Sequence, residues 1–396
     1  MYGREIERSI QKHLHAEKIL LILWARQVGK TSIMKKIKLE LEEQAYECFY
    51  INLEDPLYLG NLNGHPKNIL DIIGAGWGKK YVFIDEIQLL DNPSNFLKYL
   101  YDEHREQIKL IVSGSSAFYI DTKFRDSLAG RKKIFYTYTL NFREFLLFKK
   151  QEKIYTALLQ KHPLTLYTLQ DILPLYHEYI IYGGYPELVL CDTIEEKKEY
   201  LQSIANSYIK KDILEASIRQ HDKYYFILKI LAAQTGNLVN MQEIWNTINL
   251  PNPTVERYIY TMQKSFHIGL VRPFYERNIR KELTKMPKVY FFDTGLRNYF
   301  AGNFEPLEQR VDIWALLENL VYKNLLTHYT FDSIKFWRTQ NKNQVDFVLE
   351  DTKKAYEVKA RLKNFDLKKY SLFQTTYPEY NLEAIDLEKS IELLLP

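Results

Sequence analysis

One run of eight residues carries the chemical groups that bind a nucleotide phosphate. It reads Ala25-Arg26-Gln27-Val28-Gly29-Lys30-Thr31-Ser32 and lies between the apolar stretch 19–23 and an amphipathic stretch at 33–41. Such a site needs backbone N–H groups that face phosphate oxygens, an ammonium for the β and γ phosphates, and a hydroxyl for Mg²⁺. Gly29, Lys30 and Thr31 supply these groups. The order predicts a strand, a P-loop and a helix that bind ATP and Mg²⁺; the alternative is a chance Gly-Lys-Thr in a turn.

A second run supplies the acids that such a site requires. Residues 81–84 are apolar and end in Asp85 and Glu86, as expected for a parallel strand that is buried on both faces. Asp85 would help to hold the Mg²⁺ that the Thr31 hydroxyl ligates, and Glu86 would orient and polarise the attacking water. An acidic pair at a strand end can also be a helix cap, but its position after the Gly-Lys-Thr favours a role in hydrolysis.

Two further candidates follow along the chain. The strand predicted at 109–112 ends in Ser113-Gly114-Ser115-Ser116, where either Ser113 or Ser115 could hydrogen-bond the γ-phosphate or the water; a serine-rich turn is the alternative. Arg131 could reach the γ-phosphate of a neighbouring subunit as an arginine finger, and a surface ion pair is the alternative. Strands that alternate with helices and carry ligand groups at their carboxyl ends predict a doubly wound parallel sheet.

The composition is that of a globular protein with several domains. At 396 residues, two to four domains of roughly 100–200 residues each are expected. The chain is 46% hydrophobic and 26% charged, with a mean hydropathy of −0.35, which argues against disorder. No run approaches the ~18 apolar residues of a membrane span, so a cytoplasmic location is expected. Two cysteines, Cys48 and Cys191, cannot form a disulfide framework or a zinc site on their own.

The middle of the chain is predicted to be helical and then to change character. Residues 149–222 contain a rigid turn, Gly183-Gly184-Tyr185-Pro186-Glu187, and are expected to form a helical lid over the nucleotide. Residues 223–300 predict three helices and then two strands, at 270–275 and 288–292, which together suggest a winged helix. In the third of these helices, spacing places four side chains toward the core: Val255, Tyr258, Ile259 and Met262.

A basic segment lies between the two strands of this predicted winged helix. Residues 272–288 carry six basic and two acidic side chains, an excess as large as the net charge of +4 for the whole chain. A localised patch of this kind is what contacts with DNA phosphates need, so we expect the segment to be the wing that binds double-stranded DNA. A solvated charged loop is the alternative, and winged helices also serve as joints between proteins.

The C-terminal part holds a second chemical constellation. Residues 345–349 and 355–359 predict two strands, and a turn centred on residues 351 and 352 would put Asp346 opposite Glu357. Opposed side chains have Cβ atoms roughly 5 Å apart, and Lys359 would lie on the same face. With Glu318 from an upstream helix, the two carboxylates could hold a second Mg²⁺ for phosphodiester hydrolysis. A surface hairpin with cross-strand charges is the alternative.

Taken together, these motifs resemble a family of archaeal and bacterial ATPases of the extended AAA superfamily. The resemblance covers nearly the whole chain and rests on an ordered set of short stretches: residues 26–31, 83–88, 113–116, 128–131, 183–187, 288–296, 318–321, 337–339, 345–347 and 357–359. It implies binding and hydrolysis of ATP with Mg²⁺, a winged helix, and a C-terminal restriction-endonuclease-like domain of the PD-(D/E)xK type. Two positions depart from the pattern: Trp24 stands in place of the first P-loop glycine, and Gln344 in place of a glutamate.

The first departure bears on the geometry of the loop. Glycine tolerates backbone angles that a tryptophan accepts only with strain. We therefore expect Trp24 to keep ordinary strand-end angles, to stack near the base or the lid, and to leave ATP binding intact.

The predicted fold is α/β, with a P-loop NTPase core at 1–148, a helical lid at 149–222, a winged helix at 223–300 and a nuclease-like α/β domain at 301–396. The favoured function is an ATPase that couples nucleotide state to binding or processing of double-stranded DNA, as a homo-oligomer. Two alternatives stay open: an ATP-switched signalling or scaffold oligomer with an inactive nuclease-like domain, and an ATP-gated metal-dependent nuclease.

Overall fold

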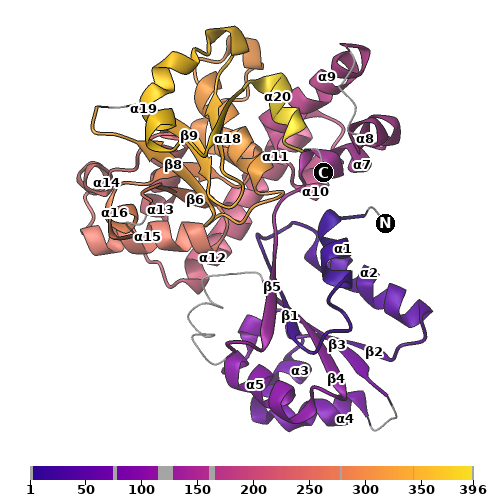
Figure 1. Ribbon diagram of the computed structural model, residues 1–396. Coiled ribbons are helices and arrows are strands. Elements are labelled where there is room, and N and C mark those ends of the chain that lie inside the picture. Colours follow the sequence, from indigo (N-terminus) through magenta and orange to yellow (C-terminus); the bar gives the residue numbers. More distant parts are fainter. Residues whose placement is uncertain are drawn as a thin grey trace. The chain divides into compact units, whose positions relative to one another are not determined.

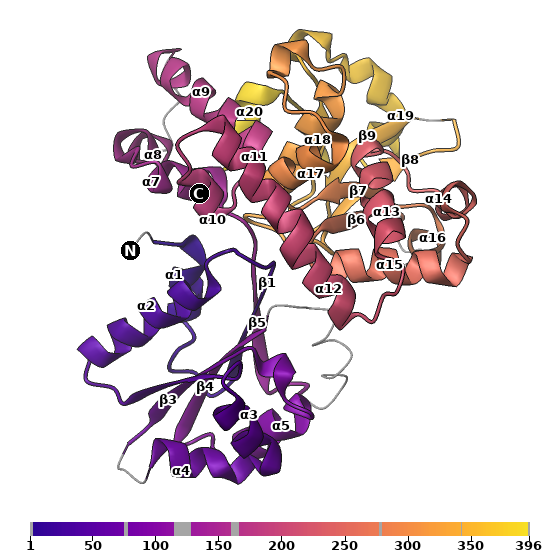
Figure 2. The same cartoon turned by 180° about the vertical axis from the view of Figure 1, so that it is seen from behind.

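A computed structural model of the chain describes residues 3–74, 78–114, 128–159, 166–276, 279–341 and 343–394. The chain divides into two compact units (Figures 1 and 2). The first comprises residues 1–138 with the short pieces 214–217 and 264–266, and the second comprises 139–213, 218–263 and 267–396. Among the described helices, none combines the length and the apolar character that crossing a membrane requires.

A five-stranded parallel sheet forms the centre of the first unit, as predicted. Its order is β2-β3-β4-β1-β5, so β1 and β3, which lead to the loop and to the acidic pair, lie on either side of β4. All residues of β3 and β4 are buried, which explains the apolar runs at 81–84 and 110–112. The strands are β1 (Ile19–Trp24), β2 (Cys48–Asn52), β3 (Lys80–Asp85), β4 (Ile108–Gly114) and β5 (Lys132–Thr137).

Helices cover both sides of this sheet, with α1 and α2 on one side and α3 and α5 on the other (Figure 1). The predicted amphipathic helix after the loop is α2, which buries Ile33, Met34, Ile37 and Leu41. The described helices of the unit are α1 (Glu5–Gln11), α2 (Lys30–Glu43), α3 (Pro56–Gly64), α4 (Ile69–Ile73) and α5 (Pro93–His104), with short 3₁₀ turns at η1 (Pro66–Asn68) and η2 (Ile87–Leu89).

The second unit begins with a group of helices. The first, α7 (Phe142–Phe148), begins directly after Asn141, because Asn141 and Glu144 each accept a hydrogen bond from the other's backbone N–H, at 2.9 and 3.1 Å. The following helices are α8 (Glu152–Leu159), α9 (Leu166–Tyr182), α10 (Pro186–Val189) and α11 (Ile194–Ser203), then a π-helical segment η3 (Ile204–Ile209) and α12 (Lys210–Glu215).

The predicted turn at Gly183 and Gly184 separates α9 from α10 and packs closely against residues 293–295. Gly184 N donates to Asp293 Oδ2 across 2.9 Å. A Cβ added at Gly183, whose φ is +86°, would lie 2.0 Å from Asp293 Oδ1, and one added at Gly295 would lie 1.8 Å from the carbonyl oxygen of Tyr182. Two motifs more than a hundred residues apart therefore need glycine because they contact each other.

Three helices and two antiparallel strands follow in the predicted order. The four side chains predicted to face the core from α15 are all buried. The basic segment, however, is not a plain loop, because residues 279–284 form the helix α16. The elements are α13 (His221–Ala233), α14 (Met241–Ile248), α15 (Asn252–Lys264), β6 (Ile268–Pro273), α16 (Ile279–Thr284), β7 (Lys288–Phe291) and α17 (Thr294–Ala301).

One mixed sheet runs through the second unit in the order β11-β10-β9-β8-β6-β7. Because β6 pairs with both β7 and β8, the two strands predicted for the winged helix share a sheet with the C-terminal strands, across the expected boundary at residue 300. The remaining strands are β8 (Ile334–Arg338), β9 (Gln344–Leu349), β10 (Lys354–Val358) and β11 (Asn381–Ile385). The remaining helices are η4 (Leu307–Gln309), α18 (Ile313–Leu325), η5 (Leu362–Asn364), η6 (Leu367–Tyr370), α19 (Ser371–Thr376) and α20 (Leu387–Glu392).

Candidate functional site

The P-loop connects β1 to α2 in a geometry suited to an anion. Gly29 has a left-handed conformation, with φ of 83°, and precedes the first residue of α2 without a side chain that caps the helix. The first backbone N–H groups of a helix have no acceptor within it, and with the helix dipole they favour a bound phosphate. Trp24 is the last residue of β1, opposite Thr137, and does not have the positive φ that would need glycine. The expectation that it keeps strand angles is confirmed.

Asp85 is the centre of a hydrogen-bonded group at the end of β3. Its carboxylate is 3% exposed, and its Oδ2 accepts from Thr31 Oγ1 at 3.2 Å and from the Tyr50 hydroxyl at 2.7 Å. The Ser113 hydroxyl donates to the other oxygen, Oδ1. Burial alone would raise the pKa of Asp85, but the Lys30 ammonium and the hydrogen bonds from Ser113 and Tyr50 outweigh it and lower the pKa. Asp85 is thus held as a carboxylate beside the Thr31 hydroxyl, as a magnesium ligand requires.

Lys30 forms ion pairs with both acids of the predicted pair. Its ammonium lies 3.2 Å from Asp85 Oδ1 and also contacts Glu86 Oε1. Gln88 Nε2 donates to the second oxygen of Glu86, and the Glu86 backbone has a left-handed φ of 59°. A strained backbone that aims a carboxylate at the P-loop lysine is typical of a functional site. Five predicted residues therefore lie together: Lys30, Thr31, Asp85, Glu86 and Ser113.

The other predicted residues of this unit lie as follows. Arg131 forms an exposed ion pair with Asp102 of α5, with Nε 2.7 Å from Oδ1, which is the surface pair named as its alternative role. Within the loop, Ala25 and Val28 are buried and Ser32 is exposed. Ser115 is outside the described residues, so only Ser113 is placed at the site.

Sequence reasoning missed Tyr50 and Gln88, and it also missed Arg4. The buried Arg4 side chain donates to the carbonyl oxygens of Val28 in the loop, at 2.8 Å, and of Tyr138, at 3.0 Å. Nothing in the spacing of Arg4 points to the loop. Tyr50 could have been found from strand register, since Asn52 pairs with Asp85 and Tyr50, two residues earlier, shares its face.

In the second unit, the predicted hairpin forms in the predicted register. Phe347 lies opposite Tyr356, one pair along from Asp346 and Glu357. Asp346 and Glu357 are both buried, at 4% and 5% exposed, and Lys359 Nζ lies 2.7 Å from Glu357 Oε1. The described residues nevertheless contain no group of three or more acidic, histidine or cysteine side chains able to hold a metal ion. That Glu318, Asp346 and Glu357 together bind one metal ion therefore stays a prediction.

A lysine lies between two of these carboxylates. Lys288, 1% exposed, places its Nζ 2.6 Å from Glu318 Oε1 and 3.0 Å from Asp346 Oδ1. Lys288 therefore does not belong to an exposed basic patch, because its side chain points into the interior of the second unit. Burial and the nearby Asp346 carboxylate raise the pKa of Glu318 to about 7 and that of Glu357 to about 7. The cluster thus holds more carboxyl groups than its lysines neutralise.

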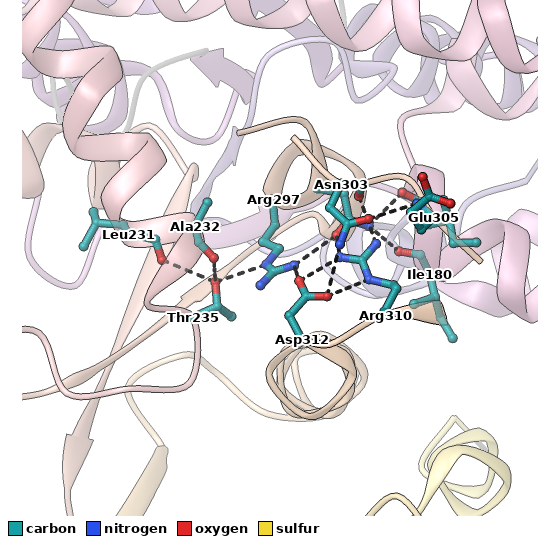
Figure 3. Close-up of polar contacts among 11 residues, drawn as sticks. Ile180, Leu231, Ala232, Thr235, Arg297, Asn303, Glu305, Arg310 and Asp312 are labelled. Atoms are coloured by element: carbon teal, nitrogen blue, oxygen red, sulfur yellow. Dashed lines mark hydrogen bonds and ion pairs between the residues drawn. The ribbon is translucent and has the colours of Figure 1, made fainter. Parts of the chain in front are cut away.

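A second polar cluster joins α17 to the segment before α18 (Figure 3). Arg297 and Arg310 both pair with Asp312, and Arg310 Nη2 lies 2.8 Å from its Oδ2. Arg310 Nη2 also donates to Asn298 Oδ1 at 2.9 Å. The two arginines are 1% and 5% exposed. Because Asp312 has a charged partner for both of its oxygens, we assign this cluster a role in stability.

Three family models match the chain in order. A model described as an AAA domain matches residues 16–146, which include the parallel sheet, the P-loop and the acidic pair. Two domains of unknown function follow: DUF8612 matches residues 173–307, and DUF4143 matches residues 315–387. Together with the loop geometry, the first match makes the first unit a P-loop domain of the AAA type.

Similar proteins extend over most of the chain at low identity. An uncharacterised protein of Methanocaldococcus jannaschii is 26% identical over 99% of this chain and 89% of its own length. An uncharacterised protein of Haemophilus influenzae is 25% identical over 86% of this chain and 80% of its own length. A solved structure of the Thermotoga maritima RuvB Holliday junction branch migration motor aligns at 16% identity and a TM-score of 0.34, over 72% of this chain and 95% of that one. The ADP form of the Aeropyrum pernix ORC2 protein aligns at 13% identity and a TM-score of 0.33, over 67% of this chain and 85% of that one. At these TM-scores, neither structure supports an inference about function.

Proposed function

We propose that this protein is a Mg²⁺-dependent ATPase whose nucleotide state governs its binding to double-stranded DNA, as a cytoplasmic homo-oligomer. The observation that carries the proposal is the contact of Asp85 with both Thr31 and Lys30, at 3.2 Å each. It joins the ends of β3 and the P-loop into one charged site, which is the arrangement that a nucleoside triphosphate with its metal needs.

Each residue of the site has a role in this proposal. Lys30 and the N–H groups at the start of α2 would hold the phosphates, and Thr31 and Asp85 would hold Mg²⁺, which offsets negative charge on the phosphate oxygens when bound. Glu86 would orient the attacking water. Because Lys30 pairs with Glu86, phosphate oxygens compete for the same ammonium, and nucleotide binding would release Glu86 for that task. Arg131 would act on a neighbouring subunit after exchanging its exposed partner Asp102 for a phosphate.

The second part of the proposal is that the protein binds double-stranded DNA. We assign it to α13–α15 with β6 and β7 as a winged helix, in which α16 takes the place of the wing loop. Support comes from the exposed bases of α16 and its C-terminal flank, Arg280, Lys281 and Lys285, and from the exposed Arg257 on α15. Phosphate contacts of this kind supply affinity without sequence preference.

One observation favours a second function over metal-dependent cleavage. The ammonium of Lys288 occupies carboxylate oxygens that a nuclease would need for its metal. The alternative is therefore a scaffold or signalling oligomer that is switched by ATP and contains an inactive nuclease-like domain.

The test is ATP turnover of the full chain, with and without duplex DNA, beside Lys30→Ala. The proposal predicts turnover that requires Lys30 and rises when DNA is added. Turnover without any effect of DNA, together with no retention of duplex, would favour the scaffold function. The absence of Lys30-dependent turnover would contradict the ATPase itself.

The basic contacts are tested separately by charge reversal. Arg280→Glu with Lys281→Glu should weaken duplex retention and reduce its salt dependence, since each lost phosphate contact removes about one unit of the salt slope. Lys368→Glu with Lys369→Glu reverses two exposed charges of the same unit outside the proposed winged helix and is the matched control. If both double variants retained duplex DNA equally, α16 would not be part of the DNA contact.

A further inference from the structure

The ammonium of Lys288 lies where the predicted nuclease-like site would bind its metal. Lys288 begins β7, Glu318 lies on α18, and Asp346 lies on β9, so the cluster joins three elements. The Nζ to oxygen distances of 2.6 and 3.0 Å are those of charge-assisted hydrogen bonds. Lys288 is nearly inaccessible, at 1% exposed, so this cation is part of the interior.

The oxygens of Asp346 all have donors from the protein. Its Oδ1 accepts from the Lys288 ammonium and from Gln344 Nε2, at 3.0 and 2.9 Å, and its Oδ2 accepts from the backbone N–H of Val358 at 3.0 Å. A Mg²⁺ ion binds carboxylate oxygens at about 2.0–2.1 Å in an octahedral shell. It could enter here only if Asp346 lost the donors that now surround it.

Glu318, whose side chain is 15% exposed, is held through one of its oxygens. Its Oε1 accepts from both Lys288 and the Tyr290 hydroxyl. Its Oε2 lies against Gly236, where an added Cβ would be 3.1 Å away. The carboxylate therefore faces an ammonium on one side and a close-packed backbone on the other.

The charge count of the cluster gives the same result. Two ammonium groups, Lys288 and Lys359, accompany three carboxyl groups, so the excess is a single negative charge. Within the described part of this cluster, Glu357 Oε2 is buried and has no hydrogen-bond donor. The ammonium groups therefore compensate two of the three carboxyl groups without a divalent cation.

We infer that Lys288 is the resident cation of this cluster and replaces a divalent metal ion. The cluster then has no metal-dependent chemistry. It fixes β7 to α18 and β9 and so holds the strand pair β6–β7 against the C-terminal elements. Removing one partner of a buried ion pair leaves an uncompensated charge. Loss of the Lys288 ammonium should therefore create a cation site that the natural protein lacks.

The test is a Mn²⁺ titration of the nucleotide-free full chain, with free Mn²⁺ followed by electron paramagnetic resonance. The wild type and Asp346→Asn should bind Mn²⁺ identically. Lys288→Met should gain one site with an apparent Kd at least about tenfold tighter than the wild type shows, because two neighbouring carboxylates lose their cation. Lys288→Met combined with Asp346→Asn should lose that site again. Lys323→Met, which removes a buried lysine from the single carboxylate Asp293, is the control and should gain none.

Two results would overturn the inference. The first is a wild-type Mn²⁺ site that disappears in Asp346→Asn, and the second is a folded Lys288→Met protein that gains no site. If circular dichroism shows that Lys288→Met does not fold, the comparison of the wild type with Asp346→Asn decides alone. Neither outcome depends on ATP binding at Lys30, so failure of the proposed function is distinguishable from failure of this inference.

Discussion

The Tyr50 hydroxyl donates a hydrogen bond to Asp85 Oδ2 across 2.7 Å and so connects β2 to the proposed magnesium ligand. Tyr50→Phe removes this bond and leaves the ring. Partners that orient a metal ligand typically contribute about tenfold or more to metal affinity. We expect half-maximal ATP turnover to require about tenfold more Mg²⁺. Tyr46→Phe, which removes an exposed hydroxyl from the same unit, is the control; an unchanged Mg²⁺ requirement in Tyr50→Phe would contradict the role.

Glu86→Gln should separate hydrolysis from binding. The amide keeps the shape of the side chain but cannot act as a base, so turnover should fall about 10²- to 10³-fold. ATP affinity should be unchanged or tighter, because Lys30 no longer has a charged partner in Glu86. Glu103→Gln on the exposed face of α5 is the control. A Glu86→Gln protein that hydrolyses ATP at the wild-type rate would require another general base.

The substitutions Gly183→Ala and Gly302→Ala should both strain the backbone, but only Gly183→Ala should also cause a steric clash. Both glycines have positive φ, +86° and +67°, and strain of this kind costs about 1–2 kcal/mol for alanine. Only at Gly183 would the new Cβ meet Asp293, 2.0 Å away, whereas Gly302 has open space. Urea unfolding should show that the free energy of unfolding falls by more than about 3 kcal/mol in Gly183→Ala and by about 1 kcal/mol in Gly302→Ala. Equal losses would mean that the contact with Asp293 relaxes freely.

The Arg297–Asp312–Arg310 cluster should make stability depend on pH in the acid range. Although burial acts in the opposite direction, hydrogen bonds from Arg310 and Arg297 lower the pKa of Asp312 to about 2. A lowered carboxyl pKa stabilises the native state above the unfolded pKa, near 4, and that contribution is lost as the pH falls toward 2. Asp312→Asn should therefore cost about 2 kcal/mol of unfolding free energy at pH 6 and much less at pH 2.5.

Urea unfolding at a series of pH values measures this difference. Asp351→Asn, at an exposed turn position, is the control and should behave as the wild type does throughout. A constant difference between the wild type and Asp312→Asn from pH 6 to pH 2.5 would show that the charge of Asp312 is not responsible.

Local signals in the sequence predicted much of the fold and half of the nucleotide site. The parallel sheet, the helix after Gly29 and the register of Asp346 with Glu357 all follow from neighbouring residues, because spacing and turn position determine them. Lys30, Thr31 and the acids at 85 and 86 were found for the same reason.

The remainder depends on contacts between distant segments. Lys288 looks like part of a basic surface run, and only the packing of β7 against α18 and β9 turns it into a buried counter-ion. Gly183 looks like a simple turn glycine, although its partner Asp293 lies more than a hundred residues away. Arg4 and Tyr50 reach the site through the arrangement of whole elements, which no short motif encodes.

The most direct measurement is isothermal titration of the purified full chain with Mg-ATP, beside Lys30→Ala. The account predicts saturable binding near one nucleotide per chain in the wild type. Binding should be retained in Glu86→Gln and lost in Lys30→Ala, because the ammonium of Lys30 is the group that reaches the phosphates. A wild-type protein that releases or absorbs no binding heat at any temperature tested, and that shows no shift in thermal unfolding with Mg-ATP, would contradict the nucleotide site on which the proposed function rests.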